Sequence, residues 1–349
     1  MTIIEHLTRA IIIISIFSLC LIPIRKKNSL SYSLERVVTN RIKGVACIMV
    51  VVSHASFQLD GKGVFALTYN MGFIAVGAFF FISGYGLTYS LINKNNYLRG
   101  FLKNRLLLVL IPFWISNMIV LVYYLIIGKK YNVIEIIGGL TGFKLFIGHN
   151  WYVQVILLYY ILFFVIAKII NNKKNMMIVL SITIIIIIII SQCFNLKYLP
   201  EACLSSSTFI LGIIIAYNRE VLSFFVKLNI FIKCSLFILM ALSYLYLTIF
   251  RYHWIDNALL VEVCRLITPL LFVIVIIIFT QHYFFGSTIT DIIGKCSFEI
   301  YLLHQIPISI CKGIKISKGL EILIIVISSF IMGYILNRID SVITNKIKK

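Results

Sequence analysis

Long apolar segments alternate with short polar loops along the whole chain. A segment of about 20 mostly apolar residues can cross a bilayer as an α-helix, and the alternation contains about eleven such segments. The pattern predicts an all-α fold, a polytopic transmembrane helical bundle of about 10–11 transmembrane helices. The expected spans are 7–24, 43–59, 71–92, 106–127, 151–170, 176–194, 203–217, 229–249, 257–279, 297–311 and 319–337.

The composition agrees with a membrane environment for most of the chain. Hydrophobic residues occupy 61% of the 349 positions, charged residues occupy 13%, and the mean hydropathy is +1.02. A single soluble core cannot bury that share of apolar side chains. No long polar run separates the spans, so we expect no attached soluble domain. Glu5 precedes the first span and the basic cluster Arg25-Lys26-Lys27 follows it, the reverse of a secretory signal, so we expect a retained helix.

The formal net charge of +20 arises from short loops between the spans. If the amino terminus is outside and the spans alternate, inner segments hold twenty of the Lys and Arg residues, outer segments hold ten, and two lie inside helices. Basic loops are retained in the cytoplasm. We therefore predict a multi-pass protein of the cell (cytoplasmic) membrane, with the carboxyl terminus in the cytoplasm and no nucleic-acid partner.

The eight cysteines lie mostly within apolar segments and form no C-x-x-C pair. Cysteines in this pattern are typical of reduced packing residues. We expect neither a disulfide framework nor a metal site.

His54 is an ionisable residue well inside an expected span, where a bilayer disfavours it. It follows Lys43 by eleven residues, which is about 16 Å along one helix. Three helical turns cover about 10.8 residues, so both side chains lie near one face. That face can present a cation at the cytoplasmic edge and an imidazole deeper in the membrane. The alternative is a histidine that packs between helices and bonds a carbonyl group.

Two further stretches place polar groups near the membrane. In "VGAFFFISGYGLTYSLI", Ser83 offers a hydroxyl group to a cavity, although small residues here also serve close helix packing. In "GHNWYVQVILLYY", at the outer mouth of the fifth span, His149, Asn150 and Gln154 can bind a polar acceptor such as a sugar. Trp151 belongs to the same candidate site, although interfacial anchoring is the common role of such a ring.

The stretch "GKCSFEIYLLHQIPI" holds the last candidates. Tyr301 and His304 are three residues apart and share a helix face, whereas Glu299 and His304 are five apart and do not. Pro307 frees a backbone carbonyl, and helices broken in this way often line polar cavities. We regard His304 and Tyr301 as candidate catalytic residues.

Five stretches, taken in order, resemble the membrane-bound acyltransferase-3 family. They are "NRIKGVACIMVVVSH", "FFFISGYGL", "FLKNRLLLVLIPFW", "NWYVQVILLYY" and "SFEIYLLHQIPI", and the resemblance covers about residues 41–312. The basic-x10-His motif of the family corresponds to Lys43 and His54, its "SG" to Ser83 and Gly84, and its late tyrosine and histidine to Tyr301 and His304.

The resemblance implies transfer of an acyl group, usually acetyl, from cytoplasmic acyl-CoA to a hydroxyl group of an envelope glycan. Acetyl-CoA would then be the co-substrate, and the partners would be a polysaccharide or glycolipid acceptor and the lipid bilayer. We expect an acyltransferase-3-like membrane domain over 41–340. Residues 1–40 would add a transmembrane helix and a basic loop.

The same resemblance assigns roles to residues. His54 would act as general base or, equally, as a covalent acyl carrier. His304 and Tyr301 would orient His54 or stabilise the thioester oxyanion. Coenzyme A phosphates would bind a group of basic residues. That group is Lys43, Arg99, Lys103 and Arg105.

One position departs from the family pattern. Many members carry an R-x-x-R pair before the proline of "FLKNRLLLVLIPFW", and here Leu108 follows Arg105 three places on. One arginine is absent, or other residues contact the donor.

Two other classes of protein stay open at this stage. A transporter or flippase for a glycan precursor also needs polar residues within the membrane, but requires no acyl-CoA. A structural or receptor-like membrane protein would tolerate loss of Lys43 and His54. A homo-oligomer is compatible with either class and with the enzyme.

Overall fold

A computed structural model describes residues 3–28, 34–59, 63–194, 204–250, 257–314 and 318–348. Its helices are α1 (Ile3–Leu21), α2 (Arg36–Leu59), η1 (Gly63–Thr68), α3 (Met71–Asn93), α4 (Phe101–Ile126), α5 (Val133–Thr141), η2 (Gly148–Asn150), α6 (Trp151–Ile169), α7 (Lys173–Cys193), α9 (Ser207–Tyr217), α10 (Arg219–Lys227), α11 (Ile230–Leu245), η3 (Tyr246–Phe250), α13 (Ala258–His282), α14 (Thr288–Lys295), α15 (Ser297–Leu303), α16 (Gln305–Gly313) and α17 (Lys318–Lys348). Two short strands, β1 (Arg25–Lys26) and β2 (Tyr283–Phe284), pair antiparallel.

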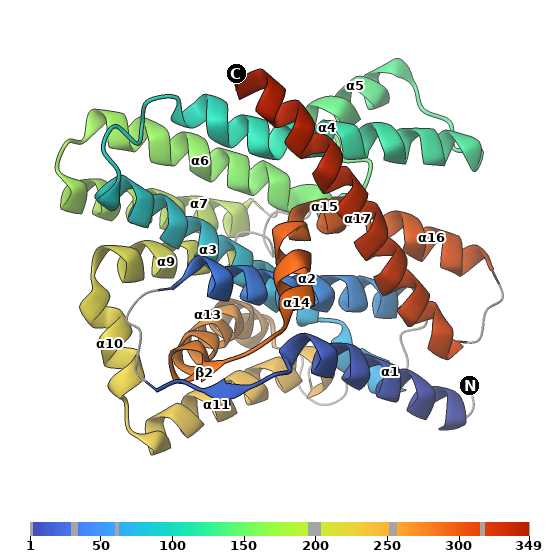
Figure 1. The fold of residues 1–349 in the computed structure, drawn as a ribbon, viewed down its shortest axis with the longest axis horizontal. Helices are drawn as coiled ribbons and strands as arrows, with labels where there is room; N and C mark the ends of the chain where they lie inside the picture. Colours follow the sequence, from blue (N-terminus) through green and yellow to red (C-terminus); the bar gives the residue numbers. More distant parts are fainter. Residues whose placement is uncertain are drawn as a thin grey trace.

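The predicted all-α helical bundle is confirmed (Figure 1). Helix α2 runs through the centre and packs against α3, α14, α15 and α17. Helices α4, α6 and α7 lie to one side of it, and α10 and α11 lie to the other. Every element that supplies a candidate site residue lies in this central group or next to it.

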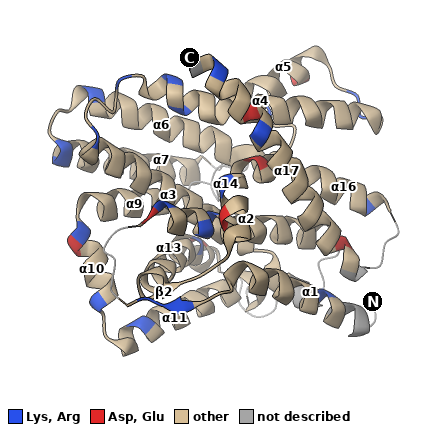
Figure 2. Cartoon of the chain, viewed as in Figure 1, with Lys and Arg blue, Asp and Glu red and all other residues tan. Residues whose placement is uncertain are grey.

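Eight helices of the described residues are long and apolar enough to cross a membrane. A ninth crossing results if α9 and α10, which are bent by 101° relative to each other, count as one span. Figure 2 shows Lys and Arg mainly near helix ends, with long helical stretches between them that carry no charge. Both features are those of a multi-pass membrane protein.

Three of the eleven expected spans take a different form. The segment 7–24 contains an apolar helix over Leu7–Leu21, which is shorter than the eight long helices. The segment 203–217 becomes α9, the first arm of the bent pair, and its first residue lies outside the described part. The segment 297–311 is divided at His304 into α15 and α16. Pro307 explains this division, because a proline ring clashes with the carbonyl group four residues earlier, here at the end of α15.

Some basic residues used for the topology prediction lie outside the described residues. They are Lys62, Lys197, Arg251, Lys315 and Lys349.

Glycines set two close helix contacts. A β-carbon at Gly294 of α14 would lie 1.8 Å from the carbonyl oxygen of Asn40 in α2. A β-carbon at Gly84 of α3 would lie 2.2 Å from the carbonyl oxygen of Phe209 in α9. Only glycine permits backbones to approach this closely. Gly84 therefore serves helix packing, the role that small residues in its segment allowed.

Helix α1 is attached to the bundle at both ends. Near its start, Arg9 forms an ion pair of 3.4 Å with Glu321 of α17, and both side chains are buried. Near its end, the hydroxyl group of Thr290 donates to the carbonyl oxygen of Cys20 at 2.7 Å. Strand β1, which comes after α1 in the chain, pairs with β2. The segment from α1 to β1 therefore contacts α14, and α14 packs on α2.

Candidate functional site

One cavity of about 970 Å³ enters the bundle beside α2, α3, α4, α6, α14 and α15. Its volume lies near the upper end of the range for ligand pockets. Five cationic side chains line it, and the sequence assigned all five to inner segments. They are Arg36, Lys43, Lys94, Arg105 and Lys295. The cavity therefore has a basic end, and polyanionic groups are the ligands that such an end favours.

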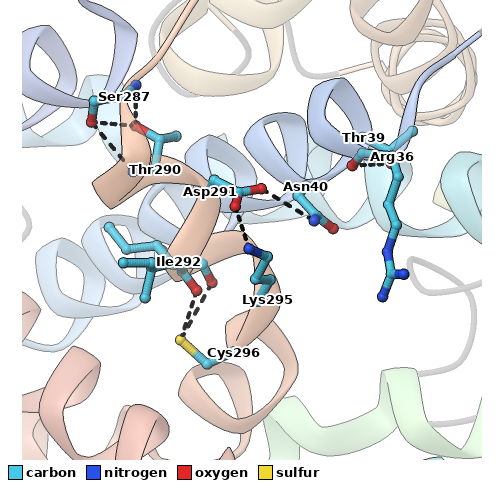
Figure 3. Close-up of polar contacts among 10 residues, drawn as sticks. Arg36, Thr39, Asn40, Ser287, Thr290, Asp291, Ile292, Lys295 and Cys296 are labelled. Atoms are coloured by element: carbon cyan, nitrogen blue, oxygen red, sulfur yellow. Dashed lines mark hydrogen bonds and ion pairs between the residues drawn. The ribbon is translucent and has the colours of Figure 1, made fainter.

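Helix α14 brings Lys295 to this end. Asp291 of α14 accepts a hydrogen bond from Asn40 of α2 at 3.2 Å and forms an ion pair of 2.5 Å with Lys295. Burial acts to raise the pKa of Asp291, but the hydrogen bonds from Lys295 and Asn40 outweigh it and leave that pKa below its usual value. Figure 3 shows Arg36 on the same side of α2, with its guanidinium group pointing away from this network.

The predicted donor-binding residues divide into two groups. Lys43 and Arg105 line the cavity. Arg105 donates to the hydroxyl group of Tyr97 at 2.8 Å, and its guanidinium carbon lies 5.9 Å from the centre of the Tyr160 ring. Arg99 and Lys103 are exposed and do not line the cavity. Their assignment to the donor stays a prediction that the cavity geometry does not support.

Leu108 lines the cavity at the position where many relatives of the resembled family carry an arginine. Sequence reasoning missed Arg36, Lys94 and Lys295, which line the same space. These three residues come from separate parts of the chain. The one sequence signal that they share is their placement in predicted inner segments.

Aromatic side chains line the inner part of the cavity. Tyr152, Tyr160 and Tyr301 line it together with Ser83, which lies next to the hydroxyl groups of Tyr152 and Tyr160. The rings of Tyr152 and Tyr301 meet edge to face, with centroids 5.8 Å apart. We call this pair the tyrosine wall. His54, His149 and His304 are not among the cavity-lining residues, but Tyr301 of the wall lines the cavity and also contacts His149 and His304.

His54 and His304 contact each other directly. The Nδ1 atom of His54 lies 2.6 Å from the Nε2 atom of His304, and His304 is fully buried. The Nδ1 atom of His304 lies 2.6 Å from the carbonyl oxygen of Tyr301. The predicted pair of Tyr301 and His304 and the more distant His54 therefore form one hydrogen-bonded chain.

This chain fixes which ring nitrogens carry hydrogen when both imidazoles are neutral. A carbonyl oxygen only accepts, so the Nδ1 atom of His304 carries a hydrogen and its Nε2 atom accepts. The Nδ1 atom of His54 is then the donor to His304, and the Nε2 atom of His54 keeps a free lone pair. That atom is the one that can take a proton.

His149 covers the face of the His54 ring. The two ring centroids are 3.9 Å apart and the planes differ by 21°. The hydroxyl group of Tyr301 donates to the backbone carbonyl oxygen of His149. His149, predicted to bind an acceptor, thus lies within the histidine cluster, which we define as His54, His149 and His304.

The other residues that were predicted to bind the acceptor substrate do not belong to this cluster. Asn150 is buried, and its Oδ1 atom has no hydrogen-bond partner among the described residues. The ring of Trp151 stacks on that of Phe80, with centroids 6.4 Å apart. Gln154 donates to the carbonyl oxygen of Gly142 at 2.6 Å. Trp151 and Gln154 therefore engage the protein itself, while Asn150 keeps an unused acceptor atom.

Glu299 is a cavity residue to which the sequence assigned no role. It is 5% exposed and lines the cavity from α15, where it follows Lys295 and precedes Tyr301 in sequence. Its Oε1 atom accepts from the side-chain amide of Asn337 at 3.1 Å. Its occurrence in an apolar segment was the only available signal.

No group of three or more His, Cys, Asp or Glu side chains within the described ranges is arranged to hold a metal ion. The histidine cluster is stacked and hydrogen-bonded rather than convergent on one point. Its geometry suits proton transfer.

Comparison with protein families gave one match. The family model for an acyltransferase domain, Acyl_transf_3, matches residues 40–338, which include the histidine cluster and the cavity-lining residues from Asn40 onward. Four lining residues at or just before the start of α2 lie outside the match, namely Leu34, Glu35, Arg36 and Thr39. Helix α1 and strand β1 precede the matched region. Searches of curated proteins and of solved structures each found no match.

Proposed function

Because the chain belongs to the membrane acyltransferase-3 family, we propose that it transfers an acyl group, most simply acetyl, from acyl-CoA to a hydroxyl group of an envelope polysaccharide or glycolipid. The donor enters the cavity from its basic end, which faces the cytoplasm if the excess of Lys and Arg in the inner segments sets the orientation. The acceptor approaches the histidine cluster from the opposite side.

The observation that carries this proposal is the continuity from the cavity to the histidine cluster. Tyr301 belongs to both, because it lines the cavity and gives its carbonyl oxygen to His304. Lys43 lines the cavity on the helix that carries His54, about 16 Å away along the axis. One helix therefore connects a phosphate-binding cation to a proton acceptor at a second depth.

In the proposed reaction His54 acts as general base. Its Nε2 atom takes the proton of the acceptor hydroxyl group while the oxygen attacks the thioester carbonyl carbon. The positive charge that His54 gains is shared through its Nδ1 hydrogen bond with His304, which the carbonyl oxygen of Tyr301 holds in the accepting tautomer. Base catalysis of this kind contributes about 10²–10⁴-fold to a rate.

His54 can also serve as the nucleophile, since the same free lone pair can attack the thioester. Burst kinetics or a trapped acyl-enzyme would favour this covalent route. A single turnover in which no acyl-enzyme forms would favour direct transfer.

Lys43 and Arg105 are the proposed contacts for coenzyme A phosphates. Arg36, Lys94 and Lys295 extend the same basic surface and offset the uncharged Leu108. A guanidinium group binds phosphate with paired hydrogen bonds, and a lysine binds it as a point charge.

The test compares ester-linked acyl groups on purified envelope polysaccharide. Cells that lack this protein receive the wild type, His54→Ala or, as a matched control, His282→Ala at equal expression. His282 lies beside Lys233 at the far end of α13, with 3.2 Å between their nitrogens. We expect the wild type and His282→Ala to restore acylation and His54→Ala to fail. Acylation that never depends on the protein would favour the alternative, transport of the same precursor.

A further inference from the structure

Glu299 is a buried carboxyl group with one unused oxygen atom. Its Oε2 atom is buried and has no hydrogen-bond partner among the described residues. The carboxyl group of Asp340 in α17 lies within hydrogen-bonding reach of the Glu299 carboxyl group, an arrangement that needs a proton on one of the two. Asn337 donates to the Oε1 atom of Glu299 at 3.1 Å, but burial disfavours the charged form and the neighbouring carboxyl group of Asp340 adds repulsion when both are charged. The protonated acid is therefore the form that suits this position.

The position of Glu299 corresponds to one particular part of a bound thioester. Glu299 precedes His304 by five residues on one helical segment, which places it about 7.5 Å nearer the basic end. If the acyl carbonyl carbon of the donor reaches the tyrosine wall and its phosphates remain at the basic end, the sulfur atom lies between these two points. Glu299 lines the cavity and would therefore lie near the sulfur atom.

Breakage of a thioester leaves an anion that needs a proton. A thiol titrates near pH 8–9 in water, and a thiolate in a cavity of low polarity is less stable than that. His54 cannot supply the proton at this moment, because it is taking one from the acceptor hydroxyl group. An acid on the donor side removes the problem.

We propose that Glu299 is the general acid that protonates the departing sulfur of the acyl donor, a role that rests on the proposed function. The acceptor oxygen forms its bond to the carbonyl carbon, and the carbon–sulfur bond breaks with its electron pair moving to sulfur. The carboxyl group of Glu299 gives its proton to that sulfur and becomes a carboxylate. It regains a proton through water in the cavity, while His54 releases the proton taken from the alcohol. Donor and acceptor thus give free thiol and ester with no other reactant.

The experiment varies the acidity of the leaving thiol. Purified protein in detergent, where both faces are accessible, is given de-esterified envelope polysaccharide and an acyl donor. The donor is either acetyl-CoA or the acetyl thioester of 4-nitrothiophenol. The aryl thiolate is stable without a proton and leaves unaided. We expect Glu299→Gln to slow transfer from acetyl-CoA by about 10²–10⁴-fold and to slow transfer from the aryl thioester far less.

Two further variants accompany this substitution. Glu299→Asp keeps an acid and should recover part of the rate with acetyl-CoA, whether or not Glu299→Gln folds well. Glu262→Gln is the matched control, because Glu262 pairs with Arg265 at 3.0 Å on α13 and does not line the cavity. It should leave the rates with both donors unchanged. Thermal unfolding of each variant reports on folding.

The outcomes separate this inference from the proposed function. Equal losses with both donors for Glu299→Gln, or no recovery in Glu299→Asp, would overturn the acid role while leaving the transferase intact. A wild-type protein that transfers acetyl from neither donor would instead overturn the proposed function itself.

Discussion

At the scale of single residues, the contact between His54 and His304 determines the direction in which a proton can move. Tyr301 holds one nitrogen of His304, His304 holds one nitrogen of His54, and the last nitrogen remains free. Neither histidine has this property alone, because an isolated neutral imidazole exchanges its hydrogen between both nitrogens. The two side chains therefore act as a unit.

A double-mutant cycle tests this unit. We expect His54→Ala to lower the transfer rate by about 10²–10⁴-fold, His304→Ala to lower it by a smaller factor, and the double variant to lose no more than His54→Ala. Initial rates of acetyl transfer to envelope polysaccharide are the measurement, with His282→Ala as control. Losses that multiply would mean that the two histidines act independently.

Sequence reasoning reached only part of this arrangement. The spacing of Lys43 and His54 is local, so helix geometry alone predicted a common face. The contact between His54 and His304 joins positions 250 residues apart, and no local pattern carries that information. For the same reason the stacking of His149 on His54 was not anticipated. Arg99 and Lys103 are close to Arg105 in sequence but do not line the cavity. Arg99 precedes α4, and Lys103 and Arg105 are two residues apart on α4, a spacing that places side chains on different faces of a helix.

At the scale of secondary-structure elements, short helices hold much of the chemistry. Helices α14, α15 and α16 are each shorter than a membrane crossing and are separated by breaks at Cys296 and His304. These short helices carry a basic residue, a carboxyl group and a histidine in succession, namely Lys295, Glu299 and His304. Apolar length predicted a span in this region, but length alone could not show that Pro307 divides it.

The contact of α14 with α2 should be the most sensitive helix contact near the cavity. We expect Gly294→Ala to lower thermal stability, by about 1–3 kcal/mol, because its new methyl group meets the backbone of Asn40. Gly86→Ala is the matched control, since nothing lies within 4 Å of a β-carbon there and alanine favours helix. Thermal unfolding in detergent compares the two. Equal effects would show that the α2–α14 contact can separate at little cost.

At the scale of the whole molecule, the described residues form a bundle whose chemistry is central and whose periphery is apolar. Exposed large side chains such as Ile134, Phe143 and Phe231 suit contact with lipid. Composition and apolar length predicted this class of fold, because both are properties of the chain as a whole. The shape of the cavity depends on many packed side chains and could not be predicted in that way.

The tyrosine wall gives a prediction at this scale. Tyr152 and Tyr301 line the cavity, and Tyr301 also contacts the histidine cluster. We expect this pair to close the path through the bundle, so that lipid vesicles containing the wild-type protein hold a proton gradient as well as empty vesicles do. A pH-sensitive dye inside the vesicles measures the leak. Replacing both rings, in Tyr152→Ala with Tyr301→Ala, should increase the leak. Wild-type vesicles that discharge rapidly would show that the wall does not close the path.

A closed wall matters for the energy economy of the cell. A membrane stores usable work as differences in voltage and ion concentration, and any continuous aqueous pore through it dissipates that store. A small acyl group can cross the membrane by transfer from a donor on one side to an acceptor on the other, and this transfer needs no continuous channel of water. If the proposed function holds, the two aromatic rings would let an acyl group cross while the membrane keeps its electrical insulation.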